Sequence, residues 1–343
     1  MNMIEHIVSN VKLKEGKKVI EKFLVHLYIH GSTSAKALAQ ELSIPVPLAT
    51  AIKKEGIKAG IIETDKNILT LAGRQFVEME LNYEGIDAEL LKSLLYNRGF
   101  KNRYINQLSE RIEGIYQGRP PVDVTLDQAF GTSKTAVKRA LLCLENFSLI
   151  GKSVLCVGDD DLISISLALL LKELFPGSQK SKARLVVLDV DQGILDYIQQ
   201  IAARHQLNIH CHQLNFKDRF PEKFTQSFDC FFTDPPYTIQ GMNLFLSRGI
   251  QGLKKEKGKP IFLSFGKKSV EENFKLQQDL IQQGLSIKTI IDSFNEYHGA
   301  SLLGNQSQMI VLETTDFTKP LLSLNASYEE PIYTREINSM LKS

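Results

Sequence analysis

Three consecutive aspartates, Asp159, Asp160 and Asp161, follow a short apolar segment, residues 153–157, that is expected to form a strand. Adjacent carboxylates repel one another, so holding three of them at a strand-to-helix turn costs free energy unless cations neutralise them. The run therefore predicts a site for a positively charged ligand. Capping of the next helix by Asp159 or Asp160, with Asp161 in solvent, is the competing structural interpretation, and it explains one aspartate better than three.

A second polar turn, Asp234-Pro235-Pro236-Tyr237, ends another apolar segment. The two prolines fix the backbone and have no N–H group, so Asp234 and the carbonyl beside Pro235 present only hydrogen-bond acceptors. Such a surface suits an amine, and the ring face of Tyr237 could cover a charged one. A purely structural turn with a packed Tyr237 is the alternative. The motif alone does not distinguish methylation of an amine from transfer of a larger group.

Two further strand ends carry side chains that suit a nucleoside. Asp189 ends the next expected strand, at the position where an acidic side chain binds ribose hydroxyls in doubly wound folds. Asp191, close to it, could instead cap the following helix. After the third strand, Asn215 could bind the adenine amino group and Phe216 could stack on the ring, although a core position for Phe216 fits the pattern equally well.

Apolar, β-rich runs that alternate with helical segments are typical of a doubly wound parallel sheet. Residues 122–316 are therefore predicted to form an α/β, Rossmann-like domain of the methyltransferase type, in which ligands bind outside the carboxyl ends of the strands. A helix capped by Thr125 or Thr132 is expected to precede the sheet, and an antiparallel pair, 286–292 with 308–313, to end it. The expected parallel strands are residues 153–157, 184–188, 208–212, 229–233 and 261–265.

Residues 1–84 show three short amphipathic helices followed by a hairpin, the order expected of a winged helix-turn-helix. Winged helices often place their third helix in the major groove of DNA, where Lys53, Lys54 and Lys58 could contact phosphates. Glu55 lies among these lysines, and no dense basic stripe is present. A structural or dimerisation role is therefore favoured over DNA binding.

The remaining segments are expected to connect or follow these domains. Residues 85–121 are predicted to be a helical linker region, because a helical pattern of mixed charge ends at the sequence Gly-Arg-Pro-Pro, residues 118–121. Residues 317–343 are expected to be a flexible C-terminal tail. Its Glu329, Glu330 and Tyr333 could close over a polycation, or lie in a disordered acidic end.

Composition excludes several classes of protein. The 343 residues carry 41 basic and 39 acidic side chains, a formal charge of +2, so no global charge favours nucleic acid or an anionic membrane. The four cysteines lie far apart and no Cys or His spacing is typical of zinc, so free thiols and no metal site are expected. No membrane span or signal peptide is predicted, and the protein is expected to be cytoplasmic.

The two acidic turns together make the chain resemble the branched-chain polyamine synthases, the N4-bis(aminopropyl)spermidine synthases of thermophiles. The resemblance extends over most of the chain, and the combination of G-D-D-D with D-P-P-Y is far more specific than either motif alone. The sequences that carry it are V-L-C-V-G-D-D-D-L from Val154, L-D-V-D around Asp189, D-P-P-Y-T from Asp234, G-M-N-L-F-L-S-R-G from Gly241 and F-N-E-Y-H-G-A-S from Phe294.

This resemblance implies an aminopropyltransferase with no tightly bound cofactor, which uses decarboxylated S-adenosylmethionine as co-substrate. Spermidine or another polyamine would be the acceptor, with N4-aminopropylspermidine and then N4-bis(aminopropyl)spermidine as products beside methylthioadenosine. The catalytic residues would be Asp159 and Asp234, with Asp159 orienting the attacking secondary amine and receiving or relaying its proton. A homodimer with a mobile C-terminal region near the active site is also implied.

By the same resemblance, the other motif residues form two binding sites. Decarboxylation removes the donor's carboxylate and keeps its amine, so an acidic site attracts this donor and repels ordinary S-adenosylmethionine. The 294–301 loop could also border the cleft. The polyamine and donor-amine site would consist of Asp160, Asp161, Tyr237 and Thr238. The methylthioadenosine site would consist of Gly158, Asp189, Asn215 and Phe216.

Two other functions fit parts of the pattern. S-adenosylmethionine-dependent methyltransferases that act on exocyclic amines of nucleic acid also use an N/D-P-P-Y turn. The missing glycine-rich turn, the aspartate run and the lack of a basic groove argue against this class and against nucleic acid as a partner. A polyamine-sensing DNA-binding regulator would instead use the α/β domain as its sensor, and DNA binding that spermidine releases would favour it.

Overall fold

The computed structural model describes residues 3–11, 13, 16–177, 181–298, 305–323 and 325–340. The chain divides into two compact units, one made of Met1–Lys101 and Leu171–Lys182 and the other of Asn102–Leu170 and Ala183–Ser343. Within the residues that the structure describes, no helix is both long and apolar enough to cross a membrane.

An eight-stranded mixed sheet, in the order β1-β7-β8-β6-β5-β2-β3-β4, forms the centre of the larger unit. Strands β2 to β6 are parallel, and β8 and then β7 extend the sheet in antiparallel pairing. This arrangement confirms the predicted methyltransferase-type α/β fold. The strands are β1 Phe130–Gly131, β2 Ser153–Val157, β3 Arg184–Asp189, β4 Ile209–Gln213, β5 Cys230–Thr233, β6 Pro260–Phe265, β7 Leu285–His298 and β8 Gln306–Thr314.

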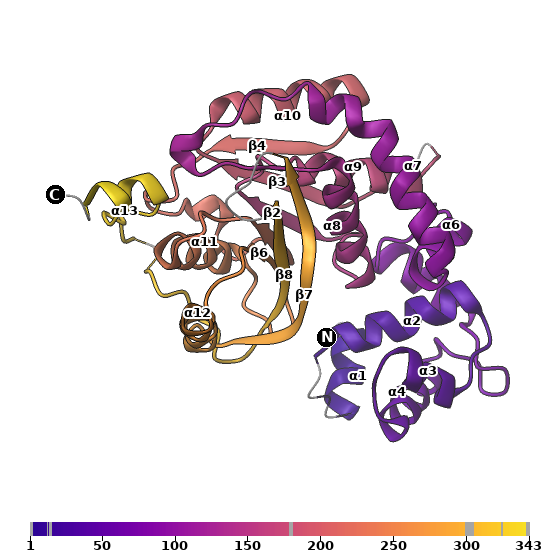
Figure 1. Cartoon of the computed structure of the whole chain (residues 1–343). Coiled ribbons are helices and arrows are strands. Elements are labelled where there is room, and N and C mark those ends of the chain that lie inside the picture. Colours follow the sequence, from indigo (N-terminus) through magenta and orange to yellow (C-terminus); the bar gives the residue numbers. More distant parts are fainter. Residues whose placement is uncertain are drawn as a thin grey trace. The chain divides into compact units, whose positions relative to one another are not determined.

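Helices cover both faces of this sheet, with α8 and α9 on one side of the strands and α11 and α12 on the other (Figure 1). The central strands are mostly apolar and almost wholly buried because helices cover both faces, as in other parallel sheets. These helices are α8 Ser133–Glu145, α9 Ile163–Leu174, α10 Gln192–His205, α11 Ile239–Gly252, α12 Val270–Gln282 and α13 Thr334–Met340, with short turns at Val124–Leu126 and Glu222–Phe224.

The antiparallel pair is longer than the sequence predicted. Strand β7 continues past the expected end at residue 292 to His298, and the register shifts between Ile291 and Asn295. Such an irregularity, like a β-bulge, bends a strand and changes the direction of the side chains that follow it. Residues 294–298 of the expected loop are therefore strand, and residues 299–301 lie outside the described residues.

Side-chain caps set two helix starts that position the site. The Thr132 hydroxyl accepts a hydrogen bond from the Thr135 N–H at 3.1 Å, so Thr132 and not Thr125 caps α8. Asp191 caps α10 by accepting from Gly193 N–H at 2.8 Å, as its alternative interpretation stated. Both caps fix where a helix begins next to a strand end.

The C-terminal segment makes several contacts in its described part. Tyr328 N–H donates to the Lys217 carbonyl at 2.8 Å, and the Arg248 Nη2 donates to the Ala326 carbonyl at 2.8 Å. Ile332 is buried in the core of the same unit. The flexibility expected of residues 317–343 stays a prediction.

The smaller unit is helical and packs its own core, which includes Phe23, Leu24 and Leu38. The expected wing is reduced to one bridge between Ile62 and Leu69, because Thr70 accepts from Gly73 N–H and starts a helix instead of continuing the strand. The winged-helix assignment stays a prediction. The helices are α1 Met3–Val11, α2 Lys18–His30, α3 Ala35–Glu41, α4 Val46–Lys58, α5 Leu71–Gln75, a π-helix Phe76–Glu80 and α6 Ala88–Tyr96, and α7 Arg98–Gln117 begins in this unit and ends in the other.

Close packing of α11 on the sheet gives a stability prediction. A Cβ atom at Gly249 would lie 2.4 Å from ring atoms of the fully buried Phe231. Gly249→Ala is therefore expected to lower the free energy of unfolding by about 1–3 kcal/mol, measured by thermal or denaturant unfolding. Gly114→Ala is the matched control, because that helical position has open space around it. Equal stability of the two variants would contradict the packing argument.

Candidate active site

A small cavity of about 50 Å³ lies at the carboxyl ends of β2, β3 and β5. Four of its lining side chains are aspartates, and the lining residues that the structure describes include no Lys, Arg or His. Aromatic rings complete the wall. The lining consists of Leu126, Asp127, Gln128, Gly158, Asp160, Asp189, Val190, Phe216, Asp234, Pro236, Phe245 and Tyr333.

The predicted site residues divide into two groups around this cavity. Residues that line it lie at or just after the ends of four strands, β2, β3, β4 and β5, as expected for a doubly wound sheet. Their functional roles, and those of the second group, stay predictions. The lining group is Gly158, Asp160, Asp189, Phe216 and Asp234. The group outside the lining is Asp159, Asp161, Asn215, Tyr237 and Thr238.

The three consecutive aspartates have three different environments. Asp159 is buried and caps α9, accepting from Ile163 N–H at 2.7 Å and from Ser164 N–H at 3.2 Å. Asp161 is buried and accepts from the Gly131 N–H at 2.5 Å. Asp160 is half-buried and has no hydrogen bond or ion pair within the described part of the chain. The capping interpretation therefore holds for Asp159 but is wrong in placing Asp161 in solvent, and Asp160 lines the cavity.

Burial raises the pKa of three carboxyls at this edge of the sheet, those of Asp159, Asp160 and Asp189. It raises the pKa of Asp159 to about 8 and that of Asp189 to about 6. Burial, together with the negative charge of Asp161, raises the pKa of Asp160 well above its usual range. A cation that enters the cavity would favour the ionised forms and would release protons from the site.

The residues predicted to bind a nucleoside, Asp189, Asn215 and Phe216, are held in different ways. The Asp189 carboxylate accepts from Asp159 N–H at 2.8 Å and from Asp191 N–H at 2.9 Å, which fixes its orientation and leaves lone pairs for a hydroxyl. Phe216 packs against Phe245 with ring centroids 4.7 Å apart, so it is both a core residue and part of the cavity wall. The Asn215 carboxamide oxygen accepts from its local backbone, at Lys217 N–H.

The aspartate of the D-P-P-Y turn accepts hydrogen bonds at both carboxylate oxygens. Tyr237 donates its hydroxyl to Asp234 Oδ1 at 2.9 Å, and Tyr297 donates to Asp234 Oδ2 at 2.6 Å. Burial and the nearby Asp161 raise the pKa of Asp234 to about 6 against the opposing effect of a guanidinium. Thr238 caps α11 and donates to the Ile332 carbonyl at 2.7 Å, so its contacts are structural ones.

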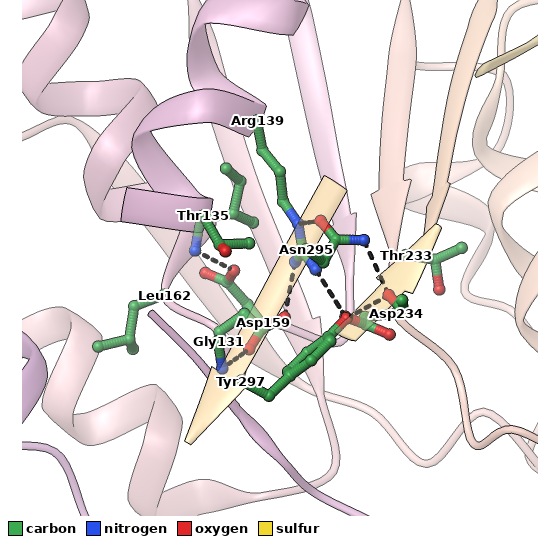
Figure 2. A network of polar contacts seen from close by, with 12 residues as sticks. Gly131, Thr135, Arg139, Asp159, Leu162, Thr233, Asp234, Asn295 and Tyr297 are labelled. Atoms are coloured by element: carbon green, nitrogen blue, oxygen red, sulfur yellow. Dashed lines mark hydrogen bonds and ion pairs between the residues drawn. The ribbon is translucent and has the colours of Figure 1, made fainter. Parts of the chain in front are cut away.

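Arg139 is the residue that sequence reasoning missed. Its Nη1 lies 2.6 Å from Asp161 Oδ2 and its Nη2 lies 2.7 Å from Asp234 Oδ2, so it joins the two acidic turns. Nε donates to Asn295 Oδ1 at 2.9 Å and Nη2 also donates to the Tyr297 hydroxyl at 3.1 Å. Figure 2 shows the side chain of Arg139 reaching from α8 toward Asp234, Asn295 and Tyr297.

One sequence signal could have identified this arginine. Arg139 lies within the predicted helix, directly before Ala140 and close to Val137, which face the core. An arginine on a buried helical face needs hydrogen-bond acceptors around its guanidinium, and acidic side chains are frequent partners. Asn295 and Tyr297 were considered only as loop residues, because the extension of β7 is not visible in the sequence pattern.

Asp160 has no hydrogen-bond or ion-pair partner among the described residues. This gives a prediction that can be tested in the absence of ligand. Ionising a carboxyl whose pKa is raised in the folded state destabilises the fold as the pH rises above the ordinary carboxyl value. Asp160→Asn is therefore expected to have a higher Tm than the unchanged protein at pH 8, and the difference should disappear near pH 4. Asp292→Asn is the control, because its carboxylate is 66% exposed and pairs with Lys267. A difference that does not depend on pH would disprove this account.

Comparison with known proteins places the chain in a family. The family model described as the branched-chain polyamine synthase A C-terminal domain matches residues 107–326. The N(4)-bis(aminopropyl)spermidine synthase of Methanocaldococcus jannaschii is 31% identical over 86% of this chain and 83% of its own length. The synthase of the same name from Thermococcus kodakarensis is 29% identical, with the same coverage of both chains.

A solved structure agrees with this assignment at the level of the fold. The crystal structure of the branched-chain polyamine synthase from Thermus thermophilus, in complex with N4-aminopropylspermidine and 5′-methylthioadenosine, has a TM-score of 0.58 and 20% identity. The comparison covers 97% of this chain and 96% of that chain. Since the family model also matches more than half of the sequence, the chain belongs to the branched-chain polyamine synthase family and is a transferase.

Proposed function

We propose that this protein transfers the aminopropyl group of decarboxylated S-adenosylmethionine to the secondary amine of spermidine, giving N4-aminopropylspermidine and then N4-bis(aminopropyl)spermidine. The cavity lining is the observation that carries the proposal. Its aspartates, with no basic residue among the described lining, suit cationic ligands. Its aromatic side chains suit the adenine ring.

Charge selects the donor in this proposal. The decarboxylated donor carries a sulfonium and an amine and no carboxylate, so every charge on its reacting side is attracted by an acidic cavity. Ordinary S-adenosylmethionine would place its carboxylate among Asp160, Asp189 and Asp234, where like charges repel one another. The Thermus thermophilus relative was crystallised with N4-aminopropylspermidine and 5′-methylthioadenosine, which fits the same pair of products.

The transfer is a displacement at carbon. The lone pair of the neutral acceptor nitrogen attacks the methylene carbon beside the sulfonium, and the carbon–sulfur bond breaks with its electrons going to sulfur. Methylthioadenosine leaves as a neutral thioether. The first transfer forms an ammonium that loses one proton, whereas a second transfer to the tertiary amine gives a quaternary nitrogen with no proton to lose. The site must therefore bind polycations and also accept a proton.

Two carboxyls compete for the proton-accepting role. The family resemblance assigns it to Asp159, but both oxygens of Asp159 accept backbone N–H groups at the start of α9. Asp160 lines the cavity without a partner among the described residues. We propose that Asp160 and Asp234 face the substrate amines, with Asp159 as the alternative proton acceptor.

The variants Asp159→Asn and Asp160→Asn separate these roles. Asparagine retains a carbonyl oxygen, which can still accept from the N–H groups at the start of α9. The variant that removes the proton acceptor should lower kcat by about 10²–10⁴-fold. A variant that removes only a binding charge should mainly raise KM, by about 10–100-fold. Steady-state kinetics with spermidine measure both parameters. Normal kinetics in both variants would exclude the aspartate run from the reaction.

Substrate entry requires a wider site than the structure shows. The cavity of about 50 Å³ is smaller than the ~300–1,000 Å³ of typical ligand pockets. Tyr333 lies in its wall, and the next residue, Thr334, donates its N–H and its hydroxyl to Asp127 Oδ2 at 2.7 and 2.9 Å. We propose that the C-terminal segment and residues 126–128 withdraw to admit the substrates, in keeping with the expected mobility of the tail.

The same proposal includes a homodimer that acts in the cytoplasm on spermidine and other polyamines, with a winged-helix-like domain at residues 1–84 that serves assembly and not DNA binding. Light scattering of the purified full chain measures the mass of the assembly. The mass of a monomer would remove the dimer from the proposal and would leave the chemistry unaffected.

Mass spectrometry of the products tests the reaction directly. Purified protein is incubated with spermidine and either decarboxylated or ordinary S-adenosylmethionine. We expect spermidine to gain one and then two aminopropyl units, and only with the decarboxylated donor. Methyl transfer from the ordinary donor would instead support an amine methyltransferase. Absence of any transfer, with DNA binding that spermidine releases, would support the regulator.

A further inference from the structure

Arg139 is a buried cation between two carboxylates that belong to different motifs. Its side chain is 3% exposed, and those of Asp161 and Asp234 are 4% and 13% exposed. Within the described residues, it is the only arginine or lysine that forms an ion pair with either aspartate. The group therefore carries two acidic side chains and one basic side chain in a largely dry environment.

Removing the guanidinium would leave two buried carboxylates side by side. Like charges at this range cannot both remain ionised at low cost, so one of them takes up a proton. An arginine side chain stays charged at all relevant pH values, so Arg139 is a permanent counter-charge. Asp161 already shows its effect, because Arg139 holds the pKa of that carboxyl below its usual range although burial opposes this.

Its hydrogen bonds also fix the orientation of Asp234. Asp234 Oδ2 accepts from Arg139 and Tyr297, and Oδ1 accepts from Tyr237, so the plane of the carboxylate is held from both ends. The same guanidinium holds Asp161 through Nη1, and Asp161 in turn accepts from the Gly131 N–H beside α8. One side chain thus ties together the turns after β2 and β5.

We propose that Arg139 is a positioning residue that keeps Asp234 ionised and oriented toward the cavity. Its effect on catalysis rests on the function proposed above, whereas its effect on the charge of the two aspartates does not. Three different N–H groups of the planar guanidinium reach Asp161, Asp234 and Asn295, which a single ammonium group cannot reproduce. Lysine would keep the charge and lose the geometry.

A ligand-free experiment tests the charge. The Tm of the full-length protein and its Arg139→Gln variant is measured between pH 5 and pH 8. We expect the destabilisation by Arg139→Gln to grow as the pH rises, because the raised carboxyl pKa values make ionisation of the folded state costly. Adding Asp161→Asn should remove much of this pH dependence. The titratable groups that act on Arg139 or are acted on by it are Asp161, Asp234, Tyr297, Cys156 and Lys138.

Arg248→Gln is the matched control for this experiment. Arg248 is also fully buried, but its hydrogen bonds go to the Phe216 and Ala326 carbonyls and to the amide oxygen of Gln251. Its loss should lower Tm by an amount that changes little with pH. If the Tm difference caused by Arg139→Gln were equally independent of pH, Arg139 would have a packing role only, and the proposal would be overturned.

Kinetics then test the positioning role. If the protein transfers aminopropyl groups, Arg139→Gln should shift the acid limb of the plot of kcat/KM against pH to a higher pH, by about 1–3 pH units. Arg139→Lys should leave the limb near its original pH and lower kcat. An unshifted limb in Arg139→Gln would refute the role in catalysis. If the unchanged protein shows no transfer, the proposed function fails, and the ligand-free Tm profiles still decide whether Arg139 sets the charge of Asp234.

Discussion

The guanidinium of Arg139, buried between Asp161 and Asp234, is the interaction on which the geometry of the site depends. A doubly wound sheet brings its strand ends to one edge, but this does not determine how acidic turns from different strands share that edge. Here the positive charge allows two carboxylates to be buried within reach of one another. The bonds from Arg139 to Asn295 and Tyr297 extend the same constraint to the antiparallel end of the sheet.

The aspartates of the site differ in their partners, and one of the three consecutive aspartates has none among the described residues. Asp159 is satisfied by the first N–H groups of α9, and Asp189 accepts two backbone N–H groups. Asp161 is paired with Arg139. Only Asp160, of this run, lacks a partner among the described residues and also lines the cavity. A cationic ligand therefore finds one unsatisfied carboxyl within a framework that is otherwise complete.

The extension of β7 connects the fold to this chemistry. Asn295 and Tyr297 lie beyond a shift in register, which turns the end of the strand toward the D-P-P-Y turn. Tyr297 and Tyr237 donate to opposite oxygens of Asp234, and their hydroxyl oxygens lie 2.9 Å apart. Groups from α8, β7 and its own turn thus hold the aspartate. A change in any of these elements should therefore alter the orientation of Asp234 at the cavity.

The sequence by itself determined the α/β class, the positions of the parallel strands and the acidic character of the strand ends, because local apolar runs and turn residues express them directly. It also correctly placed Gly158, Asp160, Asp189, Phe216 and Asp234 at one edge of the sheet. Only the tertiary structure decided which aspartate of the run faces the cavity. Neighbouring residues in a turn point in different directions, and the pairing of Asp161 with Arg139 depends on a helix that no local pattern relates to it. The register shift in β7 is likewise a product of long-range pairing, which explains why the 294–301 segment, with Tyr297 in it, could not be placed from the sequence.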